Sequence, residues 1–386
     1  MSTSNEGKVQ ISLLTAAKTL ERTSISLPPP SPTELQIAIR STTLCGSDLH
    51  YYNHYRNGDI IVKAPLTLGH ESSGVVTAVG EYVREKWSVG DRVALEVGVP
   101  CGECEGCSSG RYNICSGLKF RGSAKSDPHY WGTLQERINH PARWCHKVPE
   151  NVSFTAAALL EPLSVAIHAT RRVRKLGTLG PSSSILILGA GAVGLLVATM
   201  CKLSGATKIV ISDINTGRTS FAVENGFATQ VHRPTIRQKR PETVEEKLDM
   251  AKDSAKAAKT TLGREEGFDV TFECTGMEIC TQTGIYATRS GGSLILLGMG
   301  NPVQTLPISA AALREVDILG GFRYANTYKE GIEIISSGQI PALEKIVTHK
   351  MVGIENVQDA FEMAGRQVDD AGALVIKVEC AFGGES

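Results

Sequence analysis

The sequence predicts an α/β protein in which a doubly wound parallel sheet is combined with a second, mostly β domain. Three observations predict it: short β-branched strands give way near Ser153 to alternating strands and helices, a glycine-rich turn joins a buried strand to a helix, and the chain has 386 residues. Domains usually hold about 100–200 residues, so two are expected. We place the first domain at residues 1–160, the second at 161–323, and a return to the first at 324–386.

Short strands dominate the first third of the chain. Residues 35–40 alternate apolar and polar side chains, as a half-buried strand does. Residues 74–80 and 91–95 are β-branched runs bounded by glycine. The proline cluster at 28–32 predicts a stiff turn between strands. This part therefore predicts the mostly β domain.

Strands and helices alternate in the second half. After a long helix predicted at 155–175, the apolar run 184–189 fits a strand buried on both faces of a parallel sheet. A helix follows at 192–203, and further strands are expected at 208–212, 268–272, 292–297, 316–319 and, in the returning segment, 373–378. We interpret the charged stretch 232–266, with a solvated helix at 242–259, as surface decoration without chemistry.

Composition excludes several partner classes. Lys and Arg number 40, as do Asp and Glu, so the formal net charge is zero and no field favours nucleic acid or anionic membranes. No apolar run approaches the roughly 18 residues of a membrane span. Residues 1–10 are polar and lack the pattern of a signal peptide. The cytoplasm is the expected compartment, where thiols stay reduced and patterned cysteines favour metal binding.

Four cysteines lie close together in the pattern C-x2-C-x2-C-x7-C, at Cys101, Cys104, Cys107 and Cys115. Four thiolates suit a closed tetrahedral zinc site. A cytosolic disulfide pair and an iron–sulfur cluster are the alternatives, but the C-x3-C-P run common in iron–sulfur proteins is missing. The spacing therefore predicts a structural zinc. Cysteines 145, 201, 274 and 280 are expected to be small core residues, while Cys380 has no predicted role.

A second set of ligand-type residues is dispersed in sequence. Cys45 follows a strand, His70 and Glu71 precede another, and Glu161 lies in the long helix. Each alone fits an ordinary reading: a core cysteine, a turn histidine or a solvated carboxylate. Together, Cys45, His70 and a carboxylate would leave one coordination position open, which is the arrangement of a catalytic zinc.

The turn Gly189-Ala-Gly-Ala-Val-Gly194 follows the buried strand and opens a helix, the context that supports a dinucleotide-binding motif. Gly189 allows the tight turn, Gly191 the approach of the pyrophosphate, and Gly194 the close packing of helix on strand. Asp213 ends the next strand, where a carboxylate binds the ribose 2′-hydroxyl and repels a 2′-phosphate. NAD is therefore expected rather than NADP, although Arg218 could hold a phosphate. The alternative is a nucleotide-binding domain without redox chemistry.

These residues together resemble the zinc-containing medium-chain dehydrogenases over essentially the whole chain, and most closely their polyol branch of sorbitol, xylitol and arabinitol dehydrogenases. The stretches that carry the resemblance are CGSDLHYY at 45–52, GHE at 69–71, LEPLSVAIH at 160–168, IYATRSGG at 285–292, ALREVD at 312–317 and GFRY at 321–324. The resemblance implies a GroES-like catalytic domain beside a Rossmann domain, two zinc ions per chain, NAD, and a homotetramer.

The resemblance also implies residue roles. Cys45, His70 and Glu71 resemble the catalytic zinc ligands, with Glu161 beside the metal as a direct or water-mediated ligand. Ser47 and His50 resemble the proton-release route. Polyol hydroxyls would be contacted by Tyr51, Arg323 and Tyr324, with Glu161 nearby. The expected NAD contacts beyond the three glycines are Val193, Asp213, Arg218, Leu297, Gly298, Met299, Gly321, Phe322 and Arg323.

The implied reaction is oxidation of a sugar alcohol to a ketose, with sorbitol to fructose favoured. Xylitol, L-arabinitol and galactitol are the alternative substrates. A non-enzymatic NAD-binding structural protein and a zinc-free quinone reductase of the same fold are the rival functions. The complete set Cys45, His70 and Glu71 disfavours the first rival, and the cysteine cluster disfavours the second.

Overall fold

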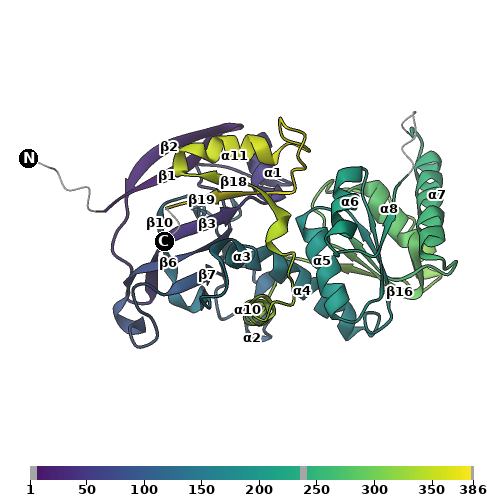
Figure 1. Ribbon diagram of the computed structural model, residues 1–386, viewed down its shortest axis with the longest axis horizontal. Coiled ribbons are helices and arrows are strands. Elements are labelled where there is room, and N and C mark those ends of the chain that lie inside the picture. Colours follow the sequence, from purple (N-terminus) through teal and green to yellow (C-terminus); the bar gives the residue numbers. More distant parts are fainter. Residues whose placement is uncertain (1–6, 235–240, 384–386) are drawn as a thin grey trace, which may run out of the picture. The chain divides into compact units, whose positions relative to one another are not determined.

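The computed structural model describes residues 7–234 and 241–383, and the chain divides into two compact units (Figure 1). The first unit is Met1–Glu161 with Ala325–Ser386, and the second is Pro162–Tyr324. The predicted polar start at 1–10 and the charged stretch 232–266 lie partly outside the described residues. Among the described helices, none is both long and apolar enough to cross a membrane.

A seven-stranded sheet forms the centre of the first unit. Its order is β11-β7-β6-β3-β19-β18, and β10 also pairs with β3. All pairings are antiparallel except that of β18 with β19, so this unit is the predicted mostly β domain. The strands are β3 (Glu34–Thr43), β6 (Glu71–Val79), β7 (Arg92–Leu95), β10 (Arg137–Pro141), β11 (Cys145–Lys147), β18 (Val347–Val352) and β19 (Lys377–Ala381).

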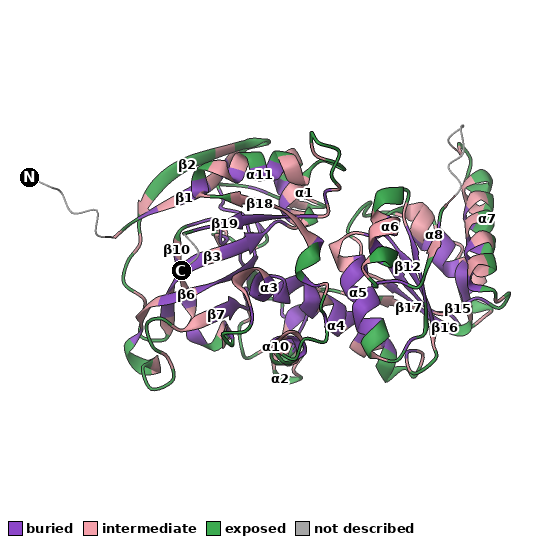
Figure 2. Ribbon diagram, in the orientation of Figure 1, coloured by how far each residue is buried: buried purple, intermediate pink, exposed green. Residues whose placement is uncertain are grey.

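Hairpins and short helices surround this sheet. The exposed strand β2 pairs with β1, and Figure 2 shows the burial of the strands behind them. The proline cluster at 28–32 lies in the turn between β2 and β3, as predicted. The remaining elements are β1 (Lys8–Ala16), β2 (Thr19–Ser26), β4 (Arg56–Asn57), β5 (Ile60–Ile61), β8 (Gly98–Val99), β9 (Lys119–Phe120), α1 (Gly46–His54), α2 (Glu105–Ser108), α3 (Phe154–Ala158), α10 (Tyr328–Ser336) and α11 (Val357–Ala364).

The second unit is the predicted doubly wound sheet. Its six strands are all parallel in the order β14-β13-β12-β15-β16-β17, with α5 and α6 on one face and α7 and α8 on the other (Figure 1). Every residue of the central strand β12 is buried. The elements are β12 (Ser184–Leu188), β13 (Lys208–Ser212), β14 (Gln230–His232), β15 (Phe268–Glu273), β16 (Thr288–Leu296), β17 (Asp317–Gly320), α5 (Ala192–Leu203), α6 (Thr216–Glu224), α7 (Val244–Leu262), α8 (Glu278–Ala287) and α9 (Ile308–Ala312).

The interpretation of residues 232–266 as surface decoration is wrong. Helix α7 is the connection between β14 and β15, and it buries Ala251, Ala255, Ala258 and Leu262 in the core of the second unit. These residues recur at helical spacing and form one apolar stripe. Thr243 and Glu246 form a capping box at the start of the helix, and Gly263 ends it in a left-handed conformation. The charged residues misled the prediction because they lie outside this apolar stripe.

Two further elements differ from prediction. The helix expected at 155–175 is broken at Leu159 into α3 and α4 (Leu160–Lys175). The strand expected at 373–378 begins four residues later, as β19, because residues 373–376 bond to the preceding turn and to Thr348 instead. The break at Leu159 separates the first turn of α4, which carries Glu161, from α3.

Candidate functional site

Cys45, His70 and Glu71 converge in the first unit. One ligand atom from each lies within 4.8 Å of the other two, although the residues come from the start of α1 and the start of β6. His70 and Glu71 are buried and Cys45 is partly buried. A thiolate, an imidazole and a carboxylate at this separation form the donor set of an open-sided zinc site, so these residues fit the metal.

Two contacts are made to the same oxygen of Glu71. The Nζ atom of Lys377 donates to Oε2 of Glu71 at 2.5 Å, and the hydroxyl of Thr43 donates to the same oxygen. Oε1 has no such partner among the described residues. Because both contacts are made to Oε2, Oε1 is the oxygen available to a metal. Sequence reasoning missed Lys377 because nothing near it in the chain points to the site.

Asp48 positions both Cys45 and His70. Its carboxylate is fully buried and accepts hydrogen bonds from the amides of Cys45 and Gly69, both at 3.0 Å. Its Oδ1 lies 3.3 Å from Nδ1 of His70, without the alignment of a hydrogen bond. This contact turns Nε2 toward the site, as a carboxylate behind a metal-binding histidine commonly does. The signal for Asp48 was its place three residues after Cys45, where it closes a capping box.

The other predicted residues of the first unit are differently placed. The hydroxyl of Ser47 lies 3.4 Å from Nε2 of His70, and His50 follows three residues later on α1. Burial, followed by repulsion from His54, lowers the pKa of His50. Tyr51 is buried, and its hydroxyl is already bonded to Ser123 and to the amide of Ala124. Glu161 is also buried, but it lies outside the three-ligand group.

The four cysteines of the cluster converge at a second place in the first unit. Their sulfur atoms lie within 4.8 Å of one another, and individual pairs are 3.4, 3.5 and 3.9 Å apart. Four sulfurs about 2.3 Å from a tetrahedral zinc would be separated by about 3.8 Å, so the cluster fits a closed zinc site. Hydrogen bonds from the amides of Glu103 and Cys104 lower the pKa of Cys101 to about 6, which favours the thiolate that binds metal.

Polar side chains fasten this lobe to the sheet of the first unit. The hydroxyl of Tyr112 donates to Glu96 at 2.6 Å and accepts from the amide of Asn326 at the same distance. Glu96 is buried and also accepts from His146 at 2.8 Å. The lobe is therefore tied both to the residue that follows β7 and to the segment that returns after the second unit.

The second unit brings together the predicted dinucleotide residues. Gly189 has φ +106°, which favours glycine. A Cβ on Gly194 would lie 2.0 Å from the carbonyl oxygen of Gly189, so this position requires glycine as well. A Cβ on Gly191 would meet nothing within 4 Å, which leaves open space above the start of α5. Oδ2 of Asp213 accepts from the amide of Ala190 at 2.8 Å, so the acid and the glycine turn are in contact. These residues fit a bound pyrophosphate and ribose.

Later segments join the same edge of the sheet. The amide of Gly321 donates to the carbonyl of Leu296 at 2.9 Å, and a Cβ on Gly321 would lie 2.3 Å from the side chain of Leu297. Met299 and Phe322 are exposed. Arg323 has φ +50° and lies over the ring of Phe322, with the guanidinium carbon 4.8 Å from the ring centre. The predicted cofactor residues thus follow the carboxyl ends of β16 and β17.

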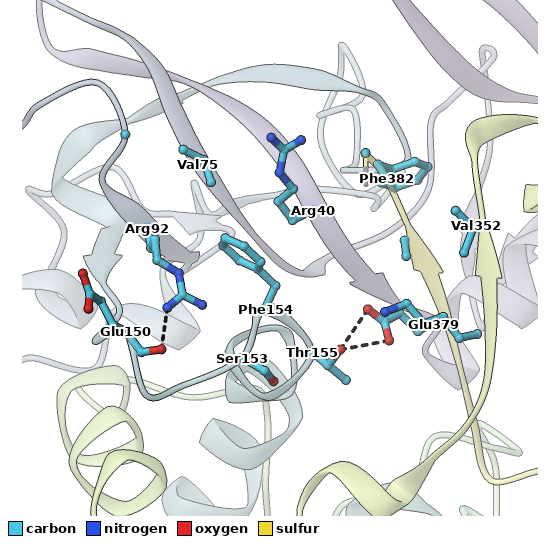
Figure 3. Close-up of a pocket in the computed structure, with 14 residues that line it drawn as sticks. Arg40, Val75, Arg92, Glu150, Ser153, Phe154, Thr155, Val352, Glu379 and Phe382 are labelled. Atoms are coloured by element: carbon cyan, nitrogen blue, oxygen red, sulfur yellow. Dashed lines mark hydrogen bonds between the residues drawn. The ribbon is translucent and has the colours of Figure 1, made fainter. Parts of the chain in front are cut away.

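A hollow of about 730 Å³ lies elsewhere in the first unit, and no predicted site residue lines it. Figure 3 shows Thr155 of α3 pointing toward Glu379 of β19, with hydrogen bonds of 3.0 and 3.1 Å. Arg92 donates to the carbonyls of Glu150 and Val152 at 2.9 and 2.6 Å. These polar groups are partnered within the protein, and they hold α3 against the sheet.

Comparisons with known proteins agree with this geometry. Residues 31–150 match the alcohol dehydrogenase GroES-like domain, and residues 192–337 match the zinc-binding dehydrogenase family. The chain is 36% identical over 366 residues to a sorbitol dehydrogenase from Arabidopsis thaliana, covering 95% of this chain and 93% of the relative. It is 36% identical to an L-idonate 5-dehydrogenase from Vitis vinifera, covering 92% and 90%.

Among solved structures, an alcohol dehydrogenase from Escherichia coli complexed with NADH superposes with a TM-score of 0.80 at 25% identity, covering 97% of this chain and all of that one. The identity to the sorbitol dehydrogenase extends over nearly the whole length of both chains, so it includes both units. The chain therefore belongs to the zinc-containing medium-chain dehydrogenases, in the polyol branch that contains the sorbitol dehydrogenases.

Proposed function

We propose that this protein oxidises a sugar alcohol to a ketose with NAD, and that sorbitol, which would yield fructose, is its preferred substrate. The observation that carries the proposal is the convergence of Cys45, His70 and Glu71 in a chain whose relatives are named sorbitol dehydrogenases. In this proposal residues 1–160 and 324–386 form the catalytic domain, and residues 161–323 bind NAD.

Two zinc sites follow from the ligand sets. Cys45, His70 and Glu71 hold the catalytic ion, with Glu161 beside it, and the four-cysteine lobe holds the structural one. At the catalytic position zinc supplies Lewis-acid activation of the substrate hydroxyl, and NAD supplies the hydride acceptor. Asp48 and Lys377 keep the three ligands oriented, so these side chains need to move little when the substrate binds.

Ser47 and His50 carry the hydroxyl proton away. They are three residues apart on α1 and therefore share a face of the helix. Because the pKa of His50 is lowered, its ring is neutral near pH 7 and can accept a proton. A site built to bond the neighbouring hydroxyls of a polyol disfavours simple alcohols.

Asp213 makes NAD the preferred dinucleotide. Its carboxylate is held beside the glycine turn by the amides of Ala190 and Asn215, both at 2.8 Å. A fixed negative charge there accepts the ribose hydroxyls and repels a 2′-phosphate.

The assembly is proposed to be a homotetramer in the cytoplasm. Val303, Ile308 and Leu313 of the second unit are exposed apolar side chains, a type of residue that subunit contacts often cover. Light scattering at micromolar concentration should give about four times the 41.3 kDa chain mass. A monomer would contradict this part of the proposal and leave the reaction untouched.

The substrate test is NAD reduction across sorbitol, xylitol, L-arabinitol, galactitol and ethanol, with the purified enzyme loaded with zinc. Sorbitol or xylitol should give the highest kcat/KM. L-Idonate is added because one relative is an L-idonate 5-dehydrogenase, and this acid is the second candidate substrate. Turnover of ethanol with no activity on any polyol or on L-idonate would refute the proposed function.

A further inference from the structure

We propose that Glu273 is a positioning residue for the dinucleotide, because its carboxylate ties together the two loops that follow β15 and β16. Glu273 is the last residue of β15 and is 1% exposed. Its Oε1 accepts from the amide of Thr275 at 2.7 Å and from the hydroxyl of the same residue. Both carboxylate oxygens lie 3.0 Å from the amide of Gly276.

The backbone of Glu273 holds the second loop. Its carbonyl oxygen accepts from the amides of Leu297 and Gly298 at 2.8 and 3.0 Å. One residue therefore binds the loop after β15 through its side chain and the loop after β16 through its main chain. Leu297 and Gly298 are also among the NAD contacts that the family resemblance implies.

Glycines allow the backbones of these two loops to pack directly against each other. Gly276 has φ +74°, and a Cβ there would lie 2.4 Å from the amide nitrogen of Gly300. A Cβ on Gly298 would lie 2.0 Å from the amide nitrogen of Gly276. The loops are thus in direct backbone contact, and a shift of the turn at Gly276 must move residues 298–300 as well.

The tied loops lie at the place where a doubly wound sheet binds its ligand. The strand order reverses between β12 and β15, and ligands bind beyond the carboxyl ends of the strands at such a point. A Cβ on Gly189 would lie 2.9 Å from Cγ2 of Thr275, so the Glu273-bound turn contacts the glycine-rich turn. Glu273 therefore supports the two loops and, through Thr275, the turn proposed to receive the pyrophosphate.

The choice of a carboxylate has a chemical reason. Burial raises the pKa of Glu273, although hydrogen bonds from Thr275 and Gly276 act in the opposite direction. No cation pairs with it within residues 7–234 and 241–383. Burying an unpaired carboxylate is costly unless N–H and O–H donors replace water. A glutamine would turn its NH2 group toward the amide of Gly276 and lose an acceptor on that side.

The inference rests on the proposed binding of NAD, so the test measures NADH binding directly. Glu273→Gln should raise the Kd of NADH about tenfold, because NADH must then order the loosened loops after β15 and β16 when it binds. The binding is followed by the fluorescence of NADH. In the Glu273→Gln variant, the KM for NAD should rise by a larger factor than the one by which kcat falls. In the protein without cofactor, amide hydrogen exchange should quicken at residues 275–276 and 297–300.

Asp269→Asn is the matched control. Asp269 lies near the opposite end of β15 and also accepts hydrogen bonds, from Ser184 at 2.7 Å and from Arg289 at 2.6 Å. This variant should lower thermal stability and leave the Kd of NADH within about twofold of the wild type. If Glu273→Gln does not fold, Thr275→Ala removes one donor and should raise the Kd by about threefold.

The outcomes separate the two proposals. If the wild type binds NADH and Glu273→Gln binds it equally well, with a loss of stability like that of Asp269→Asn, Glu273 is merely structural and the inference is wrong. If the wild type binds neither NADH nor NADPH, the proposed function itself fails, and the positioning role fails with it.

Discussion

The Nζ atom of Lys377 lies 2.5 Å from Oε2 of Glu71, although the two residues are 306 positions apart in the sequence. Lys377 opens β19, which pairs with β3, and β3 pairs with β6, where Glu71 is the first residue. The returning segment of the chain therefore completes the candidate zinc site from across the sheet.

Replacing Lys377 with methionine should impair catalysis strongly. Glu71 would lose its cation and its fixed orientation, and loss of such an outer contact typically costs 10–100-fold in metal affinity or activity. The measurements are zinc content and kcat/KM for sorbitol. Lys350→Met, on the neighbouring strand β18, should leave both within about twofold of the wild type. Wild-type kinetics and zinc content in Lys377→Met would contradict this role.

Replacing Cys104 with serine should remove one zinc without touching the catalytic ligands. Metal analysis should fall from about two to about one zinc per chain, and the midpoint of thermal unfolding should drop by several degrees. Cys280→Ser, which lies outside both ligand sets, should retain both ions. An unchanged zinc content in Cys104→Ser would show that the cluster does not hold the metal.

Asp213→Asn should weaken the preference for NAD. The amide keeps an oxygen for the N–H of Ala190 but removes the negative charge that would repel a 2′-phosphate. The ratio of kcat/KM for NAD over NADP should fall about tenfold, equivalent to about 1.4 kcal/mol. Asp249→Asn, an exposed acid on α7, serves as the control. An unaltered ratio would place the source of dinucleotide preference elsewhere.

The pH profile of polyol oxidation should report His50. Below its pKa the imidazole is protonated and cannot accept the substrate proton, so kcat/KM should fall as pH drops through a value below the ordinary 6.5. The second cause of the lowered pKa is His54, whose ring centre is 6.2 Å away. His54→Ala should move the acid limb to higher pH, and His50→Ala should slow oxidation about 100-fold. If neither variant changed the acid side of the pH profile of kcat/KM, His50 would be excluded from the proton route.

Asp269 should make the stability of the second unit depend on pH. Burial raises the pKa of Asp269, but hydrogen bonds from Ser184 and the contact with Arg289 outweigh it, so the folded pKa is below the ordinary 3.8. The stabilisation is therefore present above pH 3.8 and is lost as pH falls through the lower value. Asp269→Asn should reduce the free energy of unfolding by about 1–3 kcal/mol at pH 7, and by less near pH 3. Denaturant titrations at the two pH values test this, and an equal difference at both would refute it.

Local patterns in the sequence were sufficient for the parts of the protein that fold from short segments. The four cysteines lie within fifteen positions of one another, and their spacing alone predicted the convergence found at the lobe. The turn at 189–194 and Asp213 were predictable because a strand, a tight turn and a helix form one local unit. The alternation of strands and helices likewise predicted the parallel sheet.

Only the tertiary structure decided which distant groups meet. Lys377 and Thr43 hold Glu71 because three strands pair across the sheet, and strand pairing leaves no mark in the local sequence. Glu273 had no visible role until the loops at 275–276 and 297–298 came together around it. Helix α7 looked solvated because charged residues recur along it, yet four apolar side chains on one face place it in the core. Long-range pairing sets these relationships, whereas periodicity and motif spacing carry only short-range information.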